Sequence, residues 1–263
     1  MTYCLAINVN EGLVFCSDSR SSAGVDQIST YSKMFTFGTP GERQIVICNA
    51  GNLATTQTVI KAIEKDIRDA AKRNVLNLPS MDEIANYVGE LNVARQAENT
   101  GGGPMYEASF LVGGQIVGHP PAIYMIYPQG NYITSSPDTP FLQIGETKYG
   151  KPILDRSIRP ETSLQTATVC ALLSMDSTIR SNLTVGPPVE VLAYSANSLN
   201  VDRRFRYEAD DRDLRRLHSL WEQKLRDAVH SVPFNNWLFN WEPEMSQEQS
   251  SNPANQNQVP PTV

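Results

Sequence analysis

The sequence predicts an α+β protein in which antiparallel sheets are covered by helices. Three observations predict this class. Apolar residues near the N-terminus recur with the two-residue period of strands, whereas later segments show the longer period of amphipathic helices. Predicted strands and helices also come in runs rather than in strict alternation, which favours antiparallel sheets. The 263 residues are 40% hydrophobic and 19% charged, enough for a sizeable core.

The first two strands form a predicted hairpin. In residues 2–9 every second side chain is apolar, as expected for a strand. Residues 10–12, Asn-Glu-Gly, have the composition of a turn, and a second apolar run fills residues 13–18. A loop rich in Ser and Gly follows, and further strands are expected at 31–37 and 44–50.

A pair of amphipathic helices comes next. Residues 53–73 place their isoleucines on one face, and Ser80 with Glu83 forms a capping box that starts the second helix. The remaining expected elements are strands at 107–113, 121–127, 131–135 and 189–194 and helices at 163–180 and 210–229. In the last helix five apolar residues are expected to face inward: Leu214, Leu217, Trp221, Leu225 and Ala228.

The composition predicts one folded domain over residues 1–242 and a tail over 243–263. The tail is rich in Ser, Gln, Asn and Pro and has neither aromatic residues nor Lys or Arg, so it is expected to be disordered. Just before it lies an aromatic cluster that packs either on its own domain or on a neighbouring subunit: Phe234, Trp237, Leu238, Phe239 and Trp241.

Charge and composition narrow the class of function. The net charge of −6 argues against nucleic acid as the main partner. No apolar run approaches the roughly 18 residues of a membrane span, so no membrane association is expected. The N-terminus lacks the pattern of a signal peptide, and we therefore expect a cytoplasmic protein. The four cysteines lie in apolar runs and are interpreted as buried, reduced thiols.

The motifs of several common sites are missing. There is no HExxH and no Cys/His cluster, so no metal site is expected. GxSxG, Walker A and GxGxxG motifs are also missing, and no cofactor is expected. The three glycines at 101–103 lack the Lys-Ser/Thr of a phosphate loop, so a flexible loop is the preferred interpretation.

The start of the chain suggests a nucleophile. Initiator Met is commonly removed before a small residue, which would make Thr2 the N-terminal residue. The free α-amine has a reference pKa of about 7.7–8.0, so it can accept a proton near neutral pH. A Thr hydroxyl beside such a base is a known type of nucleophile.

Two more residues are expected beside Thr2. Regular antiparallel pairing would make Thr2 face Asp18 and Asp18 face Lys33 across three neighbouring strands. Lys33 would then lower the pKa of the hydroxyl and of the amine, and Asp18 would hold the lysine charged. The alternative is an ordinary Lys–Asp pair on a sheet and a Thr that merely starts a strand.

These residues carry a family resemblance. Thr2, the stretch "GLVFCSDSR" (12–20), Lys33 and the segment "CNAGNLA" (48–54) resemble the start of catalytic proteasome β-type subunits and of HslV-like N-terminal nucleophile hydrolases. The segments "SDSRSSAGVDQISTYSKMF" and "IGETKYGKPILDR" more specifically resemble the bacterial proteasome-related peptidases called Anbu. The resemblance extends over residues 2–240.

The resemblance implies a fold and a reaction. The fold would be a four-layer αββα sandwich with two antiparallel sheets between helical layers. Thr2 would attack a peptide carbonyl, with its own amine as the base, and Lys33 and Asp18 would tune it. The N–H of Gly51, at a helix N-terminus, would stabilise the oxyanion. Asn49 would line the pocket for the residue before the cut.

The sequence departs from the family at the supporting residues. Proteasome β-subunits carry a Ser after a Gly near the nucleophile, and here Glu146 follows Gly145 in that neighbourhood. They also carry an Asp with a Ser three residues later. Asp176 matches that Asp, but Ile179 occupies the Ser position, so Ser177 or Ser181 is the candidate substitute. Arg20, close to Asp18, is a further supporting candidate.

The implied partners are a peptide or unfolded protein as substrate and further copies of the chain. Family members form rings or related multimers, so we expect a homo-oligomer. An unfolding ATPase, if one exists, would be a separate chain. Two alternatives to a threonine peptidase stay open: an amidase or acylase of the same fold, and a catalytically weak scaffold subunit. Silent subunits typically lose the Thr or the Lys, and this chain has both.

Overall fold

A computed structural model describes residues 1–22, 28–98, 103–200 and 203–232. The chain divides into a first unit, Met1–Trp221, and a second unit that begins at Glu222. The first unit carries the sheets and all the candidate site residues. The predicted tail at 243–263 and the aromatic cluster at 234–241 lie outside the described residues.

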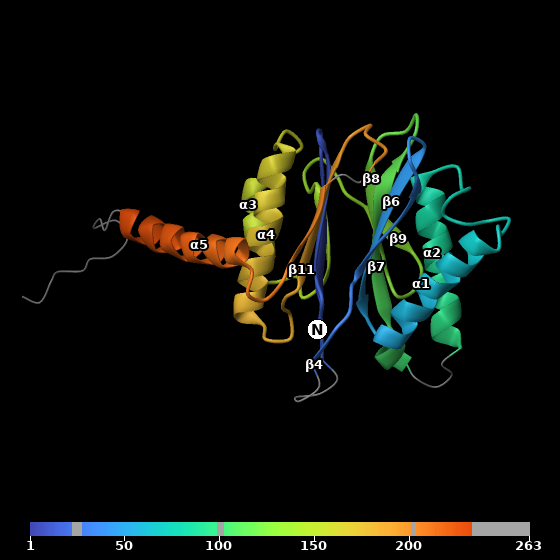
Figure 1. Cartoon of the computed structure of the whole chain (residues 1–263), viewed down its shortest axis with the longest axis horizontal. Helices are drawn as coiled ribbons and strands as arrows, with labels where there is room; N and C mark the ends of the chain where they lie inside the picture. The colour runs from blue at the N-terminus through green and yellow to red at the C-terminus, as the bar shows by residue number, and fades with distance from the viewer. Residues whose placement is uncertain (23–27, 99–102, 201–202, 233–263) are drawn as a thin grey trace, which may run out of the picture. The chain divides into compact units, whose positions relative to one another are not determined.

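Two five-stranded antiparallel sheets face each other in the first unit (Figure 1). The first sheet has the order β10-β1-β2-β11-β12, with β1 Tyr3–Val9, β2 Gly12–Asp18, β10 Phe141–Gly145, β11 Val189–Ser195 and β12 Arg203–Tyr207. The second has the order β5-β6-β7-β8-β9, with β5 Met34–Thr39, β6 Arg43–Gly51, β7 Ala108–Ile116, β8 Ala122–Ile126 and β9 Tyr132–Thr134. A small hairpin of β3 Arg20–Ser22 and β4 Ile28–Thr30 lies apart from both sheets.

Helices cover the outer face of each sheet, so the unit has four layers (Figure 1). The second sheet is covered by α1 Leu53–Arg68 and α2 Met81–Ala97, and the first by α3 Lys151–Ser157 and α4 Leu164–Ser181. A 3-10 turn, η1 Gly103–Tyr106, precedes β7, and α5 Arg212–Ser231 ends the described chain. The predicted four-layer αββα architecture is therefore confirmed.

Strand β1 shows why the alternation in the sequence leads to this architecture. Tyr3, Leu5 and Ile7 pack toward the helices of the first sheet, while Cys4 and Ala6 pack between the two sheets. All five side chains are fully buried. Successive residues of a strand point to opposite faces, so one strand supplies two cores at once.

Polar side chains begin α1 and α2, and the sequence predicts the second of these caps. The side chain of Ser80 accepts a hydrogen bond from the Glu83 N–H at 3.4 Å, as expected for the capping box. The Asn52 side chain accepts from the Thr55 N–H at 3.0 Å and begins α1 directly after β6. The end of β6 is thereby joined to the N-terminus of a helix.

The structure corrects the expected strand order. The strand expected at 31–37 is β5, and it pairs with β6 in the second sheet, not with β2. The neighbours of β2 are β1 and β11. Within the hairpin, Cys4 pairs with Ser17, so the register is one residue away from the expected one. The expected order follows from pairing of strands that are adjacent in sequence, whereas the chain crosses from the first sheet to the second after the β3–β4 hairpin.

Other boundaries also differ. The first helix ends at Arg68 rather than at residue 73, and the sequence does not predict β3, β4, η1, β10, α3 or β12. In α5 no described residue is fully buried, and of the five residues expected to face inward Leu214 packs against the core of the first sheet. Leu214, Leu217 and Trp221 are half-buried, and Leu225 and Ala228 are exposed. Among the described helices, none has the length and apolar character needed to cross a membrane.

Candidate active site

A cavity of about 700 Å³ opens where the start of β1 meets the end of β6. Its lining includes Thr2, Lys33, Asn49, Gly51 and Gly145. These residues come from both sheets and from the strand ends on one side of the molecule. The cavity therefore brings together the predicted nucleophile, the predicted lysine, the predicted oxyanion donor and the predicted pocket residue.

Lys33 and Asp18 form a buried ion pair on the wall of this cavity. The Lys33 ammonium donates to Asp18 Oδ1 at 2.8 Å, and the two side chains are 4% and 0% exposed. A second hydrogen bond runs from Lys33 Nζ to the carbonyl oxygen of Arg20 at 2.5 Å. An ammonium has three N–H donors. These two bonds leave one donor for a group in the cavity, where Thr2 lies.

The pair forms for a different reason than the one the sequence suggested. Lys33 does not face Asp18 along paired strands, because it precedes β5 in the second sheet. The Lys33 carbonyl instead accepts from the Asn49 N–H at 3.1 Å, which ties this segment to β6. Lys33 therefore reaches Asp18 across the gap between the two sheets.

Opposing effects act on the pKa of the Asp18 carboxyl. Burial raises the pKa of its carboxyl, while the Lys33 ammonium and the backbone N–H groups of Tyr3 and Gly186 oppose that rise. The Tyr3 N–H donates to Oδ1 at 3.0 Å and the Gly186 N–H to Oδ2 at 3.3 Å. Both carboxylate oxygens thus have donors, which orients the group toward Lys33.

The amino terminus has a depressed pKa. In the structure the amine belongs to Met1, one residue before Thr2. Burial and the nearby Lys33 lower the pKa of this amine below its usual 8.0, and Asp18 and Glu146 act in the opposite direction. This environment favours the neutral form of the amine near neutral pH, and only the neutral form can act as a base.

The peptide unit that follows Thr2 is fixed on both sides. The Thr2 carbonyl accepts from the Glu146 N–H at 2.7 Å, and the N–H of the same unit, from Tyr3, donates to Asp18 at 3.0 Å. Gly145 permits the first contact: its φ is +84°, and a Cβ there would lie 1.9 Å from the Thr2 oxygen. The nucleophile is therefore carried on an immobilised backbone.

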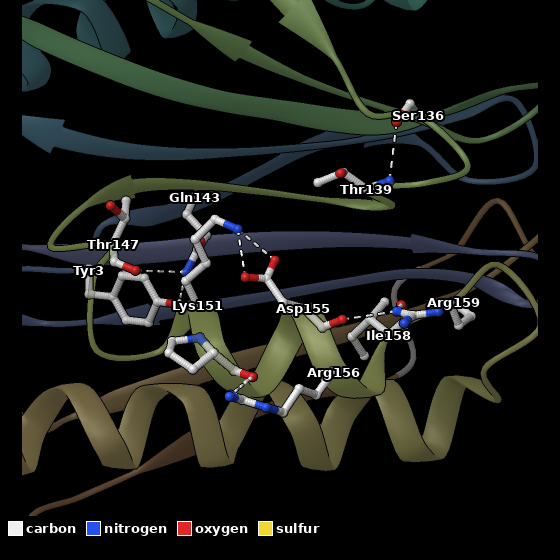
Figure 2. Close-up of polar contacts among 11 residues, drawn as sticks. Tyr3, Ser136, Thr139, Gln143, Thr147, Lys151, Asp155, Arg156, Ile158 and Arg159 are labelled. Carbon is white, nitrogen blue, oxygen red and sulfur yellow. Dashed lines mark hydrogen bonds and ion pairs between the residues drawn. The ribbon is translucent and has the colours of Figure 1, made fainter.

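Tyr3 supports this arrangement from the core side. Its hydroxyl forms a hydrogen bond with the Ser174 hydroxyl at 2.7 Å. Figure 2 shows Gln143 of β10 bridging the Tyr3 hydroxyl and the carbonyl of Thr147, to which its amide donates at 3.5 Å. The turn that carries Gly145 and Glu146 is thereby tied to the residue after Thr2.

Gly51 occupies the last position of β6, directly before the cap of α1. Its φ is +111°, and a Cβ would lie 2.4 Å from the carbonyl oxygen of Glu107. Only glycine fits this backbone without displacement. A backbone N–H at this position, near the positive end of a helix, is suited to an anionic oxygen.

Asn49 lies between two hollows. It lines the main cavity and also a neighbouring one of about 320 Å³, and both contain Tyr31, Leu53 and Thr56 in their walls. The far side of the smaller cavity includes Lys61 and Glu64. The two hollows together resemble a reaction centre with a side-chain pocket beside it.

Arg20 acts through its backbone and its packing. Its carbonyl accepts from Lys33, as described above, and its guanidinium donates to the carbonyl of Leu183 at 2.7 Å. A Cβ on Gly186 would collide with this guanidinium at 2.3 Å. Arg20 thus holds the loop after α4 against Asp18, and it is not among the residues that line the cavity.

The structure does not bring the other three supporting candidates into the cavity. Asp176 Oδ1 lies 2.8 Å from Nδ1 of His218 on α5. Ser177 is half-buried on α4, and Ser181 is exposed at its end. None of the three is among the residues that line the cavity.

Two residues beside the Thr2 backbone, neither of which is among those that line the cavity, have no role assigned from the sequence. Glu146 is 6% exposed, and its Oε2 accepts from the Asn182 amide at 3.0 Å. Asn182 immediately follows α4. The sequence did contain a signal for Glu146, because it follows Gly145 where proteasome β-subunits carry a Ser. Nothing local marks Asn182, because its place depends on the register between α4 and β10.

The described residues contain no group of three His, Cys, Asp or Glu side chains that could hold a metal ion. The groups at the site are a hydroxyl, an ammonium, a carboxylate and backbone donors. Such a set suits nucleophilic attack on a carbonyl, followed by stabilisation of the oxyanion.

Comparison with known proteins agrees with this geometry. The model of the family "Proteasome subunit" matches residues 2–193. The Anbu complex from Pseudomonas aeruginosa, solved as a helical assembly, is 48% identical, with a TM-score of 0.86, 91% of this chain covered and 100% of that one. Anbu from Yersinia bercovieri is 42% identical, with a TM-score of 0.85 and coverage of 88% and 98%.

A third solved structure, Anbu from Hyphomicrobium sp. strain MC1, is 40% identical, with a TM-score of 0.82 and coverage of 88% of this chain and 98% of that one. No curated protein sequence matches the chain. The match to the family model covers most of the chain, and the relatives are covered nearly end to end. The chain therefore belongs to the proteasome subunit family and, within it, to the Anbu group of bacterial proteasome-related proteins.

Proposed function

We propose that the chain is a threonine-type endopeptidase that acts on short or unfolded peptides. The observation that carries this proposal is the buried Lys33–Asp18 pair on the wall of a cavity that Thr2 also lines. A buried ion pair is costly to retain for stability alone. Its position beside a candidate nucleophile supports a chemical role.

The proposed reaction begins with removal of Met1. The Thr2 amine, directly or through a water, accepts the proton of the Thr2 hydroxyl as Oγ bonds to the peptide carbonyl carbon. Lys33 lowers the pKa of the hydroxyl, and the Gly51 N–H stabilises the oxyanion. The C–N bond then breaks, the proton passes to the leaving amine, and water hydrolyses the ester that remains on Thr2.

Asn49 and the neighbouring hollow would receive the side chain that precedes the cut. The amide of Asn49 makes this pocket more polar than an apolar residue would. We also propose a homo-oligomer, because a relative that is 48% identical was solved as a helical assembly. Such an assembly would restrict access to flexible substrates. An unfolding ATPase would be a separate chain. The four cysteines are free and buried, in keeping with the expected cytoplasmic location.

The first experiment measures the intact mass and the N-terminal residue of the purified protein. The proposal expects a chain that begins at Thr2. Wild type is then treated with an electrophile that forms covalent adducts with N-terminal Thr, and the adduct is placed by mass spectrometry. Thr2→Ala should lose the adduct and all turnover of peptide substrates, whereas Thr166→Ala, at an exposed position on α4, should retain both.

The outcomes separate the candidates. A chain that keeps Met1 and never turns over peptide would contradict the peptidase and favour a scaffold subunit. An adduct on Thr2 without peptide cleavage, together with hydrolysis of small amides, would favour an amidase or acylase of the same fold.

A further inference from the structure

Glu146 is a nearly buried carboxylate without a basic side chain to neutralise it. It is 6% exposed. In the described part of the chain no Lys, Arg or His side chain forms an ion pair with it, whereas Lys33 already pairs with Asp18. A carboxylate that is largely removed from water is stabilised by hydrogen-bond donors and by nearby cations.

The carboxylate is held in place from one side only. Oε2 accepts from Asn182 Nδ2 at 3.0 Å. Asn182 is fixed in turn, because its Oδ1 accepts from the Thr184 N–H at 3.0 Å and from the Thr184 hydroxyl at 2.6 Å. Among the described residues no group donates to Oε1 of Glu146. One oxygen of an anchored carboxylate is therefore left for another donor.

The amino terminus lies within the field of this carboxylate. The Glu146 backbone N–H contacts the Thr2 carbonyl at 2.7 Å, which places the two residues side by side. The charged groups that act on the terminal amine are Lys33, Asp18 and Glu146. In the structure this amine belongs to Met1. Asp18 already pairs with Lys33 at 2.8 Å, whereas Glu146 pairs with no basic side chain among the described residues.

We propose that Glu146 is the positioning residue for the Thr2 amine: once Met1 is removed, its Asn182-anchored carboxylate accepts a hydrogen bond from the amine and directs the lone pair toward the Thr2 hydroxyl. This inference rests on the proposed threonine peptidase mechanism and names the group that holds its base. Lys33 and Glu146 then act on the amine with opposite sign. Lys33 disfavours the ammonium form, and Glu146 favours it.

The test uses Glu146→Gln, which keeps the shape and can still accept from Asn182. The pH dependence of kcat/KM and the pH dependence of α-amine acylation, followed by mass spectrometry of the N-terminal peptide, are compared with wild type. Glu161→Gln, at an exposed position, is the matched control. Without the negative charge the amine pKa should fall, so the acidic limb and the labelling midpoint should both move to lower pH, by about one unit. At high pH kcat/KM should fall about tenfold.

A second variant separates charge from orientation. Asn182→Ala releases the carboxylate but keeps its charge. It should lower kcat/KM several-fold while the labelling midpoint stays close to that of wild type. If both variants change only the melting temperature, with unchanged midpoints and unchanged kcat/KM, the assignment of Glu146 is overturned.

The labelling experiment also distinguishes the two proposals. It reports the amine pKa without any turnover. A shifted midpoint in Glu146→Gln, in a protein that cleaves no peptide and forms no adduct, would refute the peptidase but support the action of Glu146 on the amine. An active peptidase whose labelling midpoint is the same in Glu146→Gln and in wild type would support the peptidase but refute the action of Glu146 on the amine.

Discussion

Two carboxylates of this chain each lie 2.8 Å from a basic side chain, in different regions of the first unit. Asp18 contacts Lys33 between the two sheets, where the side chains are 0% and 4% exposed. Asp176 contacts His218 between α4 and α5, where they are 12% and 34% exposed. The first pair borders the cavity and the second does not. The two pairs have the same separation but differ in burial and in position relative to the cavity. Burial beside the cavity is what suits the Asp18–Lys33 pair to a catalytic role.

The largest expected effect comes from breaking the buried pair. Lys33→Met removes the ammonium but keeps an unbranched side chain of similar length. We expect kcat/KM to fall roughly a thousandfold, because a charge in a desolvated site acts strongly on the nucleophile. Lys72→Met, at an exposed position, is the control. Retention of more than a tenth of wild-type activity would remove Lys33 from the mechanism.

Gly51→Ala should have the next largest effect. The new Cβ would lie 2.4 Å from the Glu107 carbonyl, on a backbone with φ of +111°. The strand end must shift, and with it the N–H proposed for the oxyanion. Loss of one such donor typically costs about 100- to 1,000-fold in kcat. The variant should still form the Thr2 adduct, slowly, and its KM should change little. A large rise in KM with unchanged kcat would contradict this role.

The pH dependence should report the amine. The amine must be neutral to accept a proton, so activity is lost as the pH falls through its pKa. Burial and Lys33 lower the pKa of the Met1 amine below 8.0. We expect the same two effects on the Thr2 amine once Met1 is removed, because Thr2 lines the same cavity as Lys33, so the acidic limb of kcat/KM should have its midpoint below pH 8. Well below the midpoint, activity should fall about tenfold per pH unit. A midpoint above pH 8 in an active enzyme would contradict the amine as the base.

Asp176→Asn should have the smallest effect and sharpen the comparison. The pair with His218 is partly exposed, so we expect stability to change by less than about 1 kcal/mol. Activity should stay within about twofold of wild type, since Asp176 does not line the cavity. Peptidase assays and thermal melts measure both. Loss of activity comparable to that of Lys33→Met would show that the region between α4 and α5 also serves the reaction.

Local patterns predicted much of the fold and the main site residues. The β1–β2 hairpin and the Ser80 cap agree with the structure, and so does the cavity position of Thr2 and Lys33. The resemblance to the family added Asn49 and Gly51, which also line the cavity. Alternation and capping depend on neighbours in sequence, which is why they could be anticipated. The resemblance to proteasome subunits supplied the roles that spacing alone did not.

Non-local pairing explains the rest. The contact of Lys33 with Asp18 was expected from adjacent strands but arises across two sheets. The role of Asp176 was assigned by matching residue types along α4, whereas the loop after that helix, with Asn182 and Gly186, lies beside the site. The contact between Asn182, at the end of α4, and Glu146, after β10, joins residues more than 30 positions apart. Such a contact leaves no periodic pattern in the sequence.

The fixed peptide unit after Thr2 also has a practical consequence for protein engineering. Both of its polar groups are engaged, by Glu146 and by Asp18, so the backbone from Thr2 onward is fixed whatever precedes it. Met1 lines the reaction cavity and is 64% exposed, so anything fused ahead of Thr2 would begin at the mouth of that cavity. Affinity tags and reporters therefore belong at the C-terminal end, and an N-terminal fusion that a protease releases at Thr2 would behave as a latent form of the protein that can be switched on at a chosen time.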